Sequence, residues 1–454
     1  MSKNWLTPDR DQLLLLAPSI ADWLPEDHLA RYVAEVVEAL DLSSIMNKYT
    51  PRAHGSTPYH PAILVALLFY GYSTGTMSSR KIERATYDSV PFRYLAGGHH
   101  PDHDTLAGFR RRHLRELNEL FVQILLLARE MGFVKVGTVA LDGTKVKASA
   151  SKHSAVSYKR AKELESKLRG EVAELLKAAE GADNTPLAEG IDIPQEIARR
   201  ETRIEKLRAA QRAIEERHGE QAVREYEEAQ EKNLEKTKRK IARGKKPPDP
   251  PEPPSKAPED KAQHNFTDSD SRIMPDKGGF TQGYNAQLSV DTESMLIVGH
   301  HLSQATNDKK ELLPALGAIA KEYGKPKAAL FDAGYFSATN IASAPEDLDL
   351  YVSPGRTPHA QSLGERLGPA VTGPAPQSAT PAQAMRHKLK TEKGRSLYRL
   401  RKMTVEPVIG IIKEAMGFRQ CLLRGREKVQ GEWGLVCLGY NLRRMWSLQT
   451  ARKA

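Results

Sequence analysis

A charge-dense segment that ends in prolines divides this chain and constrains its fold more than any other feature. Residues 157–246 hold 22 Lys+Arg and 19 Asp+Glu, so almost half of the segment is charged but nearly balanced. Two narrow apolar stripes with helical spacing flank a turn sequence at 181–186: Leu164, Leu168, Val172 and Leu175, then Ile197, Ile204, Leu207 and Ile214. This pattern predicts two antiparallel helices, a coiled-coil-like hairpin.

The sequence KKPPDPPEPPSKAP follows at 245–258 and carries 7 of the 28 prolines. Such a composition is typical of an extended spacer. We therefore interpret 157–262 as an insertion into a fold that begins before it and resumes after it. The predicted organisation has four parts: a helical N-terminal DNA-binding domain (1–130), the first strand of a catalytic domain (131–156), the hairpin with its spacer (157–262), and the rest of that domain with a basic C-terminal segment (263–454).

The N-terminal part has the apolar spacing of several short helices. The stretch 61–72 is apolar nearly all round, which predicts a buried helix. A later helix opens at Pro101 and carries Arg110, Arg111 and Arg112. Short helices with a basic late member fit a helix-turn-helix-like DNA-binding unit. An ordinary helical bundle with a basic face explains the same pattern equally well.

Acidic residues stand at the ends of two predicted strands. The predicted order is β-β-β-α-β-α-β-α over these elements: Phe133–Leu141, Phe280–Val290, Met295–Leu302, a helix at Lys309–Tyr323, Ala328–Phe331, and Leu348–Val352. Asp142 follows the first strand, Asp332 follows the fourth, and Glu406 lies on the final helical stretch. An acid at the tip of a buried strand costs free energy unless a cation compensates it. One such Asp is usually a turn or cap residue, but two in this order favour a metal site.

The basic excess is local. The chain carries a net charge of +11, whereas residues 386–454 alone carry 17 Lys+Arg and 5 Asp+Glu. That excess suggests a polyanionic partner such as nucleic acid, although a solvated basic tail is the alternative. The longest apolar stretch is too short for a membrane span, and the first residues lack a signal-type core. Cys421 and Cys437 are the only cysteines, which excludes a disulfide framework and a cysteine zinc site.

Three motifs then resemble a known family: LDGTKVKASAS around Asp142, FDAGYFSATN around Asp332, and YRLRKMTVEPVIGIIKEAMGFRQCLLRG around Glu406. Together they resemble the DDE transposases of bacterial insertion sequences, in the insertion-sequence-four-like superfamily, and within it the insertion-sequence-eleven-eighty-two type. GGFTQGYNAQ at 278–287 and the N-terminal sequences YHPAILVALLFYGYSTGTMSSRKIERA and PDHDTLAGFRRRH are similar to the same family. The resemblance covers most of 20–445.

The resemblance implies an α/β ribonuclease-H-like catalytic domain with a mixed five-stranded sheet, interrupted by the hairpin and preceded by an all-α domain. In that fold the first and fourth strands are neighbours, so Asp142 and Asp332 would lie side by side. With Glu406 they would form the catalytic, metal-binding triad. Oxygen ligands with room for water suit Mg²⁺ or Mn²⁺, here two ions.

The superfamily also carries a Tyr-Arg-Glu-Lys signature, which Tyr398, Arg401, Glu406 and Lys413 match in type. Glu406 and Lys413 are seven residues apart, two helical turns, which places both on one face. The gap from Arg401 to Glu406 is one residue longer than the common pattern, so Arg399 or Lys402 are alternatives for its role. Pro407 predicts a helix start near Thr404, because proline is tolerated only in a first turn.

The resemblance implies a transposase that binds its element's terminal inverted repeats, cuts DNA with metal ions and joins the ends to target DNA. The remaining DNA contacts would come from the N-terminal helices and from Arg419 and Arg424. We expect a homodimer in the active complex and a bacterial cytoplasmic protein, associated with the nucleoid when bound to DNA, with no membrane partner. The alternatives are an inactive or domesticated DNA-binding protein and a simple metal-dependent nuclease of the same fold.

Overall fold

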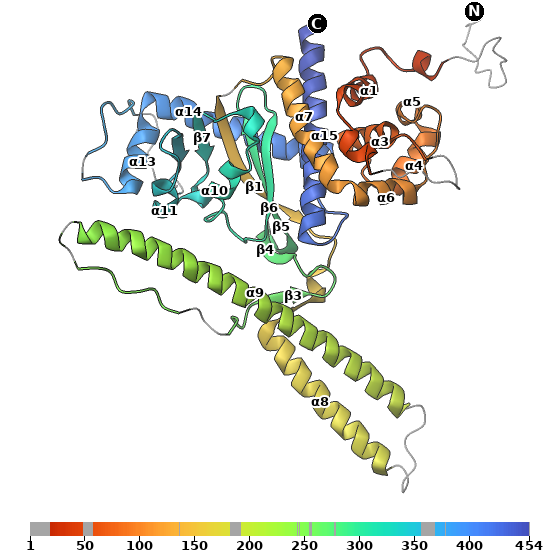
Figure 1. The fold of residues 1–454 in the computed structure, drawn as a ribbon, viewed down its shortest axis with the longest axis vertical. Helices are drawn as coiled ribbons and strands as arrows, with labels where there is room; N and C mark the ends of the chain where they lie inside the picture. The colour runs from red at the N-terminus through yellow and green to blue at the C-terminus, as the bar shows by residue number, and fades with distance from the viewer. Residues whose placement is uncertain are drawn as a thin grey trace, which may run out of the picture. The chain divides into compact units, whose positions relative to one another are not determined.

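The computed structural model describes residues 19–48, 58–135, 137–181, 192–242, 244, 246–253, 257–276, 278–355, 368–376 and 378–453. The chain forms two compact units. The first comprises 1–144, 285–422 and 427–454, and the second comprises 145–284 and 423–426. The boundaries after residues 144 and 284 each fall within a long strand. Figure 1 shows the elements of the chain, and each unit is described by itself below.

The N-terminal helical segments are η1 (Ile20–Trp23), α1 (Leu29–Ala39), α2 (Ser43–Met46), α3 (Pro61–Thr74), α4 (Ser79–Asp88), α5 (Val90–Leu95), α6 (His103–Arg112) and α7 (Leu114–Glu130). The hairpin consists of α8 (Tyr158–Gly181) and α9 (Ile193–Ile241). The strands are β1 (Thr138–Lys147), β2 (Ala155–Ser157), β3 (Gln263–Asn265), β4 (Arg272–Asp276), β5 (Gly279–Asp291), β6 (Ile297–Ser303), β7 (Ala328–Phe331) and β8 (Asp349–Val352). The remaining helical segments are η2 (Lys152–Ser154), α10 (Leu312–Gly317), η3 (Lys321–Tyr323), η4 (Ala333–Tyr335), α11 (Ala338–Ala342), α13 (Pro381–Lys390), α14 (Glu392–Gly410), the π-helical turn η5 (Ile411–Ala415) and α15 (Arg426–Lys453).

The chain contains a mixed sheet, most of whose strands belong to the first unit, whereas β4 belongs to the second. The strand order is β4-β5-β1-β7-β8, and β6 also pairs with β5. β1 pairs with β7 in parallel, as β7 does with β8, whereas β5 and β6 are antiparallel. The first and fourth predicted strands are therefore neighbours, as expected, although the chain segments that form them are far apart in sequence.

Helix α15 packs against both the sheet and the N-terminal helices. Along the outer edge of β6, the Asn441 side chain bonds the N–H and C=O of Ile297 at 2.8 Å each, and Gln430 accepts from Leu302 N at 2.6 Å. These bonds cover a strand edge that would otherwise present unpaired backbone groups. On its other side α15 approaches α3 closely: a Cβ at Gly439 would lie 2.9 Å from Ser73 N. The N-terminal helices and the sheet thus share one core (Figure 1).

The second unit contains the predicted helical hairpin. α8 and α9 pack through buried Leu168, Ile204 and Leu207, together with Val156 and Ala161 from the start of the hairpin. Both apolar stripes seen in the sequence contribute to this cluster, because helical spacing puts their members on one face of each helix. α9 has 49 residues against 24 for α8, and the turn at 182–191 lies outside the described residues.

Several element predictions differ from the structure. Among the residues that the structure describes, the sheet has six strands rather than the predicted five, because β4 pairs with β5 as an additional strand. β1 starts at Thr138 rather than Phe133 and continues to Lys147, so Asp142 lies within the strand instead of after it. The helix predicted at Lys309–Tyr323 is divided into α10 and η3, because the chain between them leaves the helix: Ala320 N bonds Val298 O at 2.9 Å. In the described part of the chain, no helix is long and apolar enough to cross a membrane.

Candidate active site

Two acids lie side by side on neighbouring parallel strands. The register pairs Ala140 of β1 with Leu330 of β7, so Asp142 and Asp332, each two residues further on, fall at the same level. Asp142 is still in β1 and accepts a hydrogen bond from Gly143 N at 2.8 Å. Asp332 is the N-cap of η4, and its carboxylate accepts from Gly334 N at 2.7 Å. The predicted pairing of these two carboxylates is present.

Helix α14 brings the third acid and an arginine to the same place. Tyr398 anchors the helix by donating its O–H to Phe331 O, the last residue of β7, at 3.1 Å. One turn later the Arg401 guanidinium donates to Asp142 Oδ2 at 3.0 Å and to Glu406 Oε1 at 3.2 Å. The Arg401 side chain is only 9% exposed, whereas Glu406 is 52% exposed. Arg401 therefore links two acids that are remote in sequence.

Burial and mutual repulsion change the titration of the paired acids. Burial raises the pKa of Asp142 to about 7, the charge of Asp332 adds to this shift, and Arg401 opposes it. Burial also raises the pKa of Asp332, while the Gly334 N–H and Arg401 act in the opposite direction. Paired carboxylates with raised pKa values gain most from a nearby cation.

The pKa of Asp142 predicts a pH-dependent stability in metal-free protein. Asp142→Asn should be more stable than wild type at pH 8 by roughly 2–4 kcal/mol, and the difference should shrink towards pH 4, at about 1.4 kcal/mol per pKa unit. The folded protein holds a proton between the ordinary value of 3.8 and about 7, so wild-type stability falls as pH rises through this window. Urea unfolding in EDTA at several pH values measures the difference. A difference independent of pH contradicts the prediction, and Asp347→Asn, an exposed surface acid, is the control.

The helix around Glu406 differs from the sequence prediction. α14 runs unbroken from Glu392 to Gly410 with Pro407 inside it, so Thr404 is not an N-cap. The Thr404 hydroxyl instead donates to Leu400 O at 2.7 Å within the helix. Proline removes a backbone donor, and the π-helical turn that follows shifts the backbone pairing, with Met416 N bonding Ile411 O. Glu406 and Lys413 are thus not separated by two regular α-turns.

The structure distinguishes among the basic residues proposed for this site. Arg401 reaches the acids, while the two alternatives, Arg399 and Lys402, are exposed. Lys413 lies half-buried on the π-helical turn, and Arg419 pairs with Glu414 of the same turn. In the second unit, Arg424 Nε donates to Ser149 O at 2.9 Å.

The three arginines of α6 have different environments. Arg110 is 6% exposed and donates to the Tyr72 hydroxyl at 2.9 Å and to Met77 O at 3.1 Å. Its guanidinium is engaged inside the helical core and is not presented at the surface. Arg111 and Arg112 are exposed.

Sequence reasoning missed a polar group next to the paired acids, formed by Asn285, Gln287, Asp308 and Tyr335. Asn285 and Gln287 lie two apart in β5, so they face the same way, and both are buried. The sequence did contain a signal for this group, namely two amides at alternate positions of a buried strand. Asp308, in the loop after β6, carried no comparable signal.

The side chains of this site suit a hard divalent cation, because the carboxylates and the Asn285 amide can provide oxygen ligands. Asn285 Oδ1 is buried and has no hydrogen-bond partner among the described residues, which is unusual for a polar atom. As they lie, no three His, Cys, Asp or Glu side chains in the described part of the chain are grouped to hold an ion. Arg401 instead occupies the position between Asp142 and Glu406.

The chain thus has a helical N-terminal region and a mixed α/β domain. In that domain Asp142, within β1, lies level with Asp332, which directly follows the neighbouring strand β7. Residues 18–112 match a family described as a transposase domain (DUF772), and residues 374–446 match a family described as a transposase DDE domain. The second match includes Tyr398, Arg401 and Glu406. No curated protein and no solved structure matches the chain. The two matches support a transposase with a DDE domain.

Proposed function

We propose that this chain is the transposase of a bacterial insertion sequence, of the insertion-sequence-four-like superfamily and closest to the insertion-sequence-eleven-eighty-two type. It binds the terminal inverted repeats, cuts the DNA at the element ends and joins the freed 3′-hydroxyls to target DNA. The matches to two transposase domains support the class. The strand order, with β1 between β5 and β7, supports a ribonuclease-H-like catalytic domain.

One observation carries the proposal most directly: the contacts of Arg401 with both Asp142 and Glu406. Together with the pairing of β1 and β7, these contacts gather three acids from segments that are distant in sequence. The sequence motifs single out the same three acids. The pairing of two acids at neighbouring strands lowers stability. A purely structural salt bridge seldom explains such a pair, whereas a functional site does.

The site residues have distinct roles in this proposal. Asp142, Asp332 and Glu406 hold divalent cations, which, when bound, neutralise charge on the phosphate and activate the attacking hydroxyl. Arg401, whose side chain is nearly buried, pairs with the acids in the absence of cations and donates to DNA phosphate oxygens in the complex. Tyr398 fixes the height of α14 relative to β7.

DNA is the partner, in the form of the inverted-repeat ends and the target. The exposed Arg111 and Arg112, together with Lys413, Arg419 and Arg424, are proposed to contact phosphates. Two ends must be joined in one event, so the active complex is proposed to be a homodimer. We further propose that the protein acts in the bacterial cytoplasm, at the nucleoid.

The test uses DNA that flanks the gene. Inverted repeats should be present there, and the protein should bind them, cut at their outer ends in Mg²⁺ and join a pre-cut end to plasmid DNA. Joined product identifies a transposase. Cutting without joining identifies a nuclease of the same fold, and binding without either reaction identifies a DNA-binding protein that has lost catalysis.

A further inference from the structure

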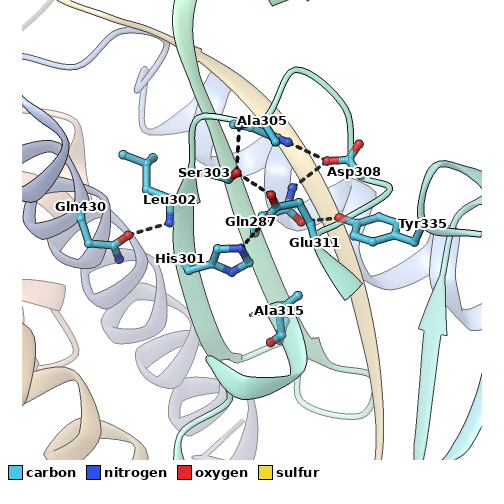
Figure 2. A network of polar contacts seen from close by, with 12 residues as sticks. Gln287, His301, Leu302, Ser303, Ala305, Asp308, Glu311, Ala315, Tyr335 and Gln430 are labelled. Atoms are coloured by element: carbon cyan, nitrogen blue, oxygen red, sulfur yellow. Dashed lines mark hydrogen bonds and ion pairs between the residues drawn. The ribbon is translucent and has the colours of Figure 1, made fainter. Parts of the chain in front are cut away.

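A fourth acidic side chain, Asp308, is held by a network of polar contacts (Figure 2). Its Oδ1 accepts hydrogen bonds from Asn285 Nδ2 and from Gln287 Nε2, each at 2.7 Å. The Gln287 Oε1 in turn accepts from the Tyr335 hydroxyl, which fixes the orientation of the amide. Asp308 is therefore oriented by neutral donors, which leave its negative charge in place.

Two glycines give this carboxylate its access to the site. Gly143 directly follows Asp142, and a Cβ there would lie 2.8 Å from Asp308 Oδ1. Gly334 binds Asp332 through its N–H, and a Cβ there would lie 3.0 Å from Asp332 Oδ1 and 3.6 Å from Asp308 Oδ2. A side chain at Gly143 would displace the Gln287 amide, whose Nε2 would lie nearest to the Cβ, as well as Asp308. The motifs around Asp142 and Asp332 thus each contain a glycine that leaves room for the carboxylate of Asp308.

An unsatisfied oxygen lies at the same point. Asn285 is fully buried, and its Oδ1, which has no hydrogen-bond partner among the described residues, would lie 3.0 Å from a Cβ at Gly143. A buried carbonyl oxygen without a donor costs about 1–3 kcal/mol, so it is normally paired. The atoms nearest to Gly143 and Gly334 include carboxylate oxygens of Asp308 and Asp332 and the amide oxygen of Asn285, besides the amide nitrogen of Gln287.

We propose that Asp308 is a further residue of the active centre: its carboxylate, with that of Asp332 and the amide oxygen of Asn285, supplies oxygen ligands to a divalent cation. Two carboxylates, one neutral oxygen and water molecules form a donor set that suits Mg²⁺ or Mn²⁺. Arg401 contacts the other two acids, Asp142 and Glu406, so Asp308 stays available to bind the cation. This inference rests on the proposed function, because it concerns the cations of the same reaction.

Mn²⁺ binding to the full-length protein, measured by electron paramagnetic resonance without DNA, tests the inference. Asp308→Asn keeps the size of the side chain and should weaken Mn²⁺ binding at least about tenfold, as loss of residues around metal sites commonly does. Glu311→Gln is the matched control and should bind Mn²⁺ as wild type does. Glu311 is a buried acid three residues on, held by His301 Nε2 at 2.8 Å and by the Ser303 hydroxyl (Figure 2).

A second variant covers the case in which Asp308→Asn does not fold. Asn285→Asp adds a carboxylate beside Asp308, so Mn²⁺ should raise its Tm by more than it raises that of wild type. Unchanged Mn²⁺ binding by folded Asp308→Asn, or an equal rise in Tm for Asn285→Asp and wild type, overturns the role of Asp308. If Asp142→Asn weakens Mn²⁺ binding in either case, the proposed function stands. Wild-type protein that binds no Mn²⁺ overturns both.

Discussion

Changing Asp142 to alanine should abolish cleavage of DNA that carries the element ends while leaving DNA binding intact. Asp142 is the most constrained of the three acids: it is nearly buried, pairs with Arg401 and lies level with Asp332. Its loss removes an oxygen ligand and leaves Arg401 with one acid partner fewer. A metal centre supplies several kcal/mol to phosphoryl transfer, so the rate should fall by a factor of about a thousand or more.

Gel assays with end-labelled DNA measure both properties in one experiment. The cleavage products should disappear, and the shifted protein–DNA band should remain, because Asp142 itself is not among the proposed phosphate contacts. Asp347→Ala removes an exposed acid that pairs with Lys325 and should cleave like wild type. Full cleavage by Asp142→Ala would remove this residue from the proposed triad.

Changing Glu432 to leucine should destabilise the protein by about 2–4 kcal/mol, because a buried hydrogen-bonding group left without its partner costs about 1–3 kcal/mol and this change leaves two. Glu432, in α15, is completely buried, and its carboxylate accepts from Leu422 N at 2.9 Å and from the Tyr72 hydroxyl at 3.5 Å. The same hydroxyl accepts from Arg110. Leucine would leave the Leu422 N–H without this acceptor and would remove the carboxylate to which the Tyr72 hydroxyl connects Arg110.

Urea unfolding followed by tryptophan fluorescence measures this loss, since Trp433 is buried next to the substituted position. Glu427→Leu is the matched control in the same helix, because Glu427 is exposed in the first turn and should change stability little. A small effect of Glu432→Leu contradicts the interpretation that this carboxylate stabilises the Tyr72 hydroxyl and the Leu422 N–H. The result also bears on Arg110, which the sequence placed among the DNA contacts.

The sequence predicted the elements whose signal is local. Ala328–Phe331 is a strand with the predicted bounds, because four apolar residues between polar ones leave few other options. The end of β1 was wrong, since its continuation through Asp142 depends on pairing with a distant strand. The break predicted at Pro407 was also wrong, because tertiary packing of Val405 and Val408 holds the helix across the missing hydrogen bond.

For the site, motifs identified acids but not their surroundings. Neighbouring parallel strands bring Asp142 and Asp332 together, and that follows from strand order alone. Which of Arg399, Arg401 and Lys402 faces the acids depends on the rotation of α14, which spacing in the sequence does not determine. Asp308 depends on the path of an irregular loop, and only the two buried amides in β5 hinted at a polar neighbour.

The pairing of β1 with β7 has a consequence for biosynthesis. The two strands are about 190 residues apart in the chain, and bacterial-type synthesis rates of roughly 5–20 residues per second separate their emergence by about 10–40 seconds. The contacts of α8 with α9 are much more local, so the hairpin completes its fold while β1 still waits for a partner. α14 and α15 emerge later still. One edge of β1 therefore stays without its partner in the nascent chain until β7 emerges about 180 residues later, and a product truncated before α14 lacks Glu406.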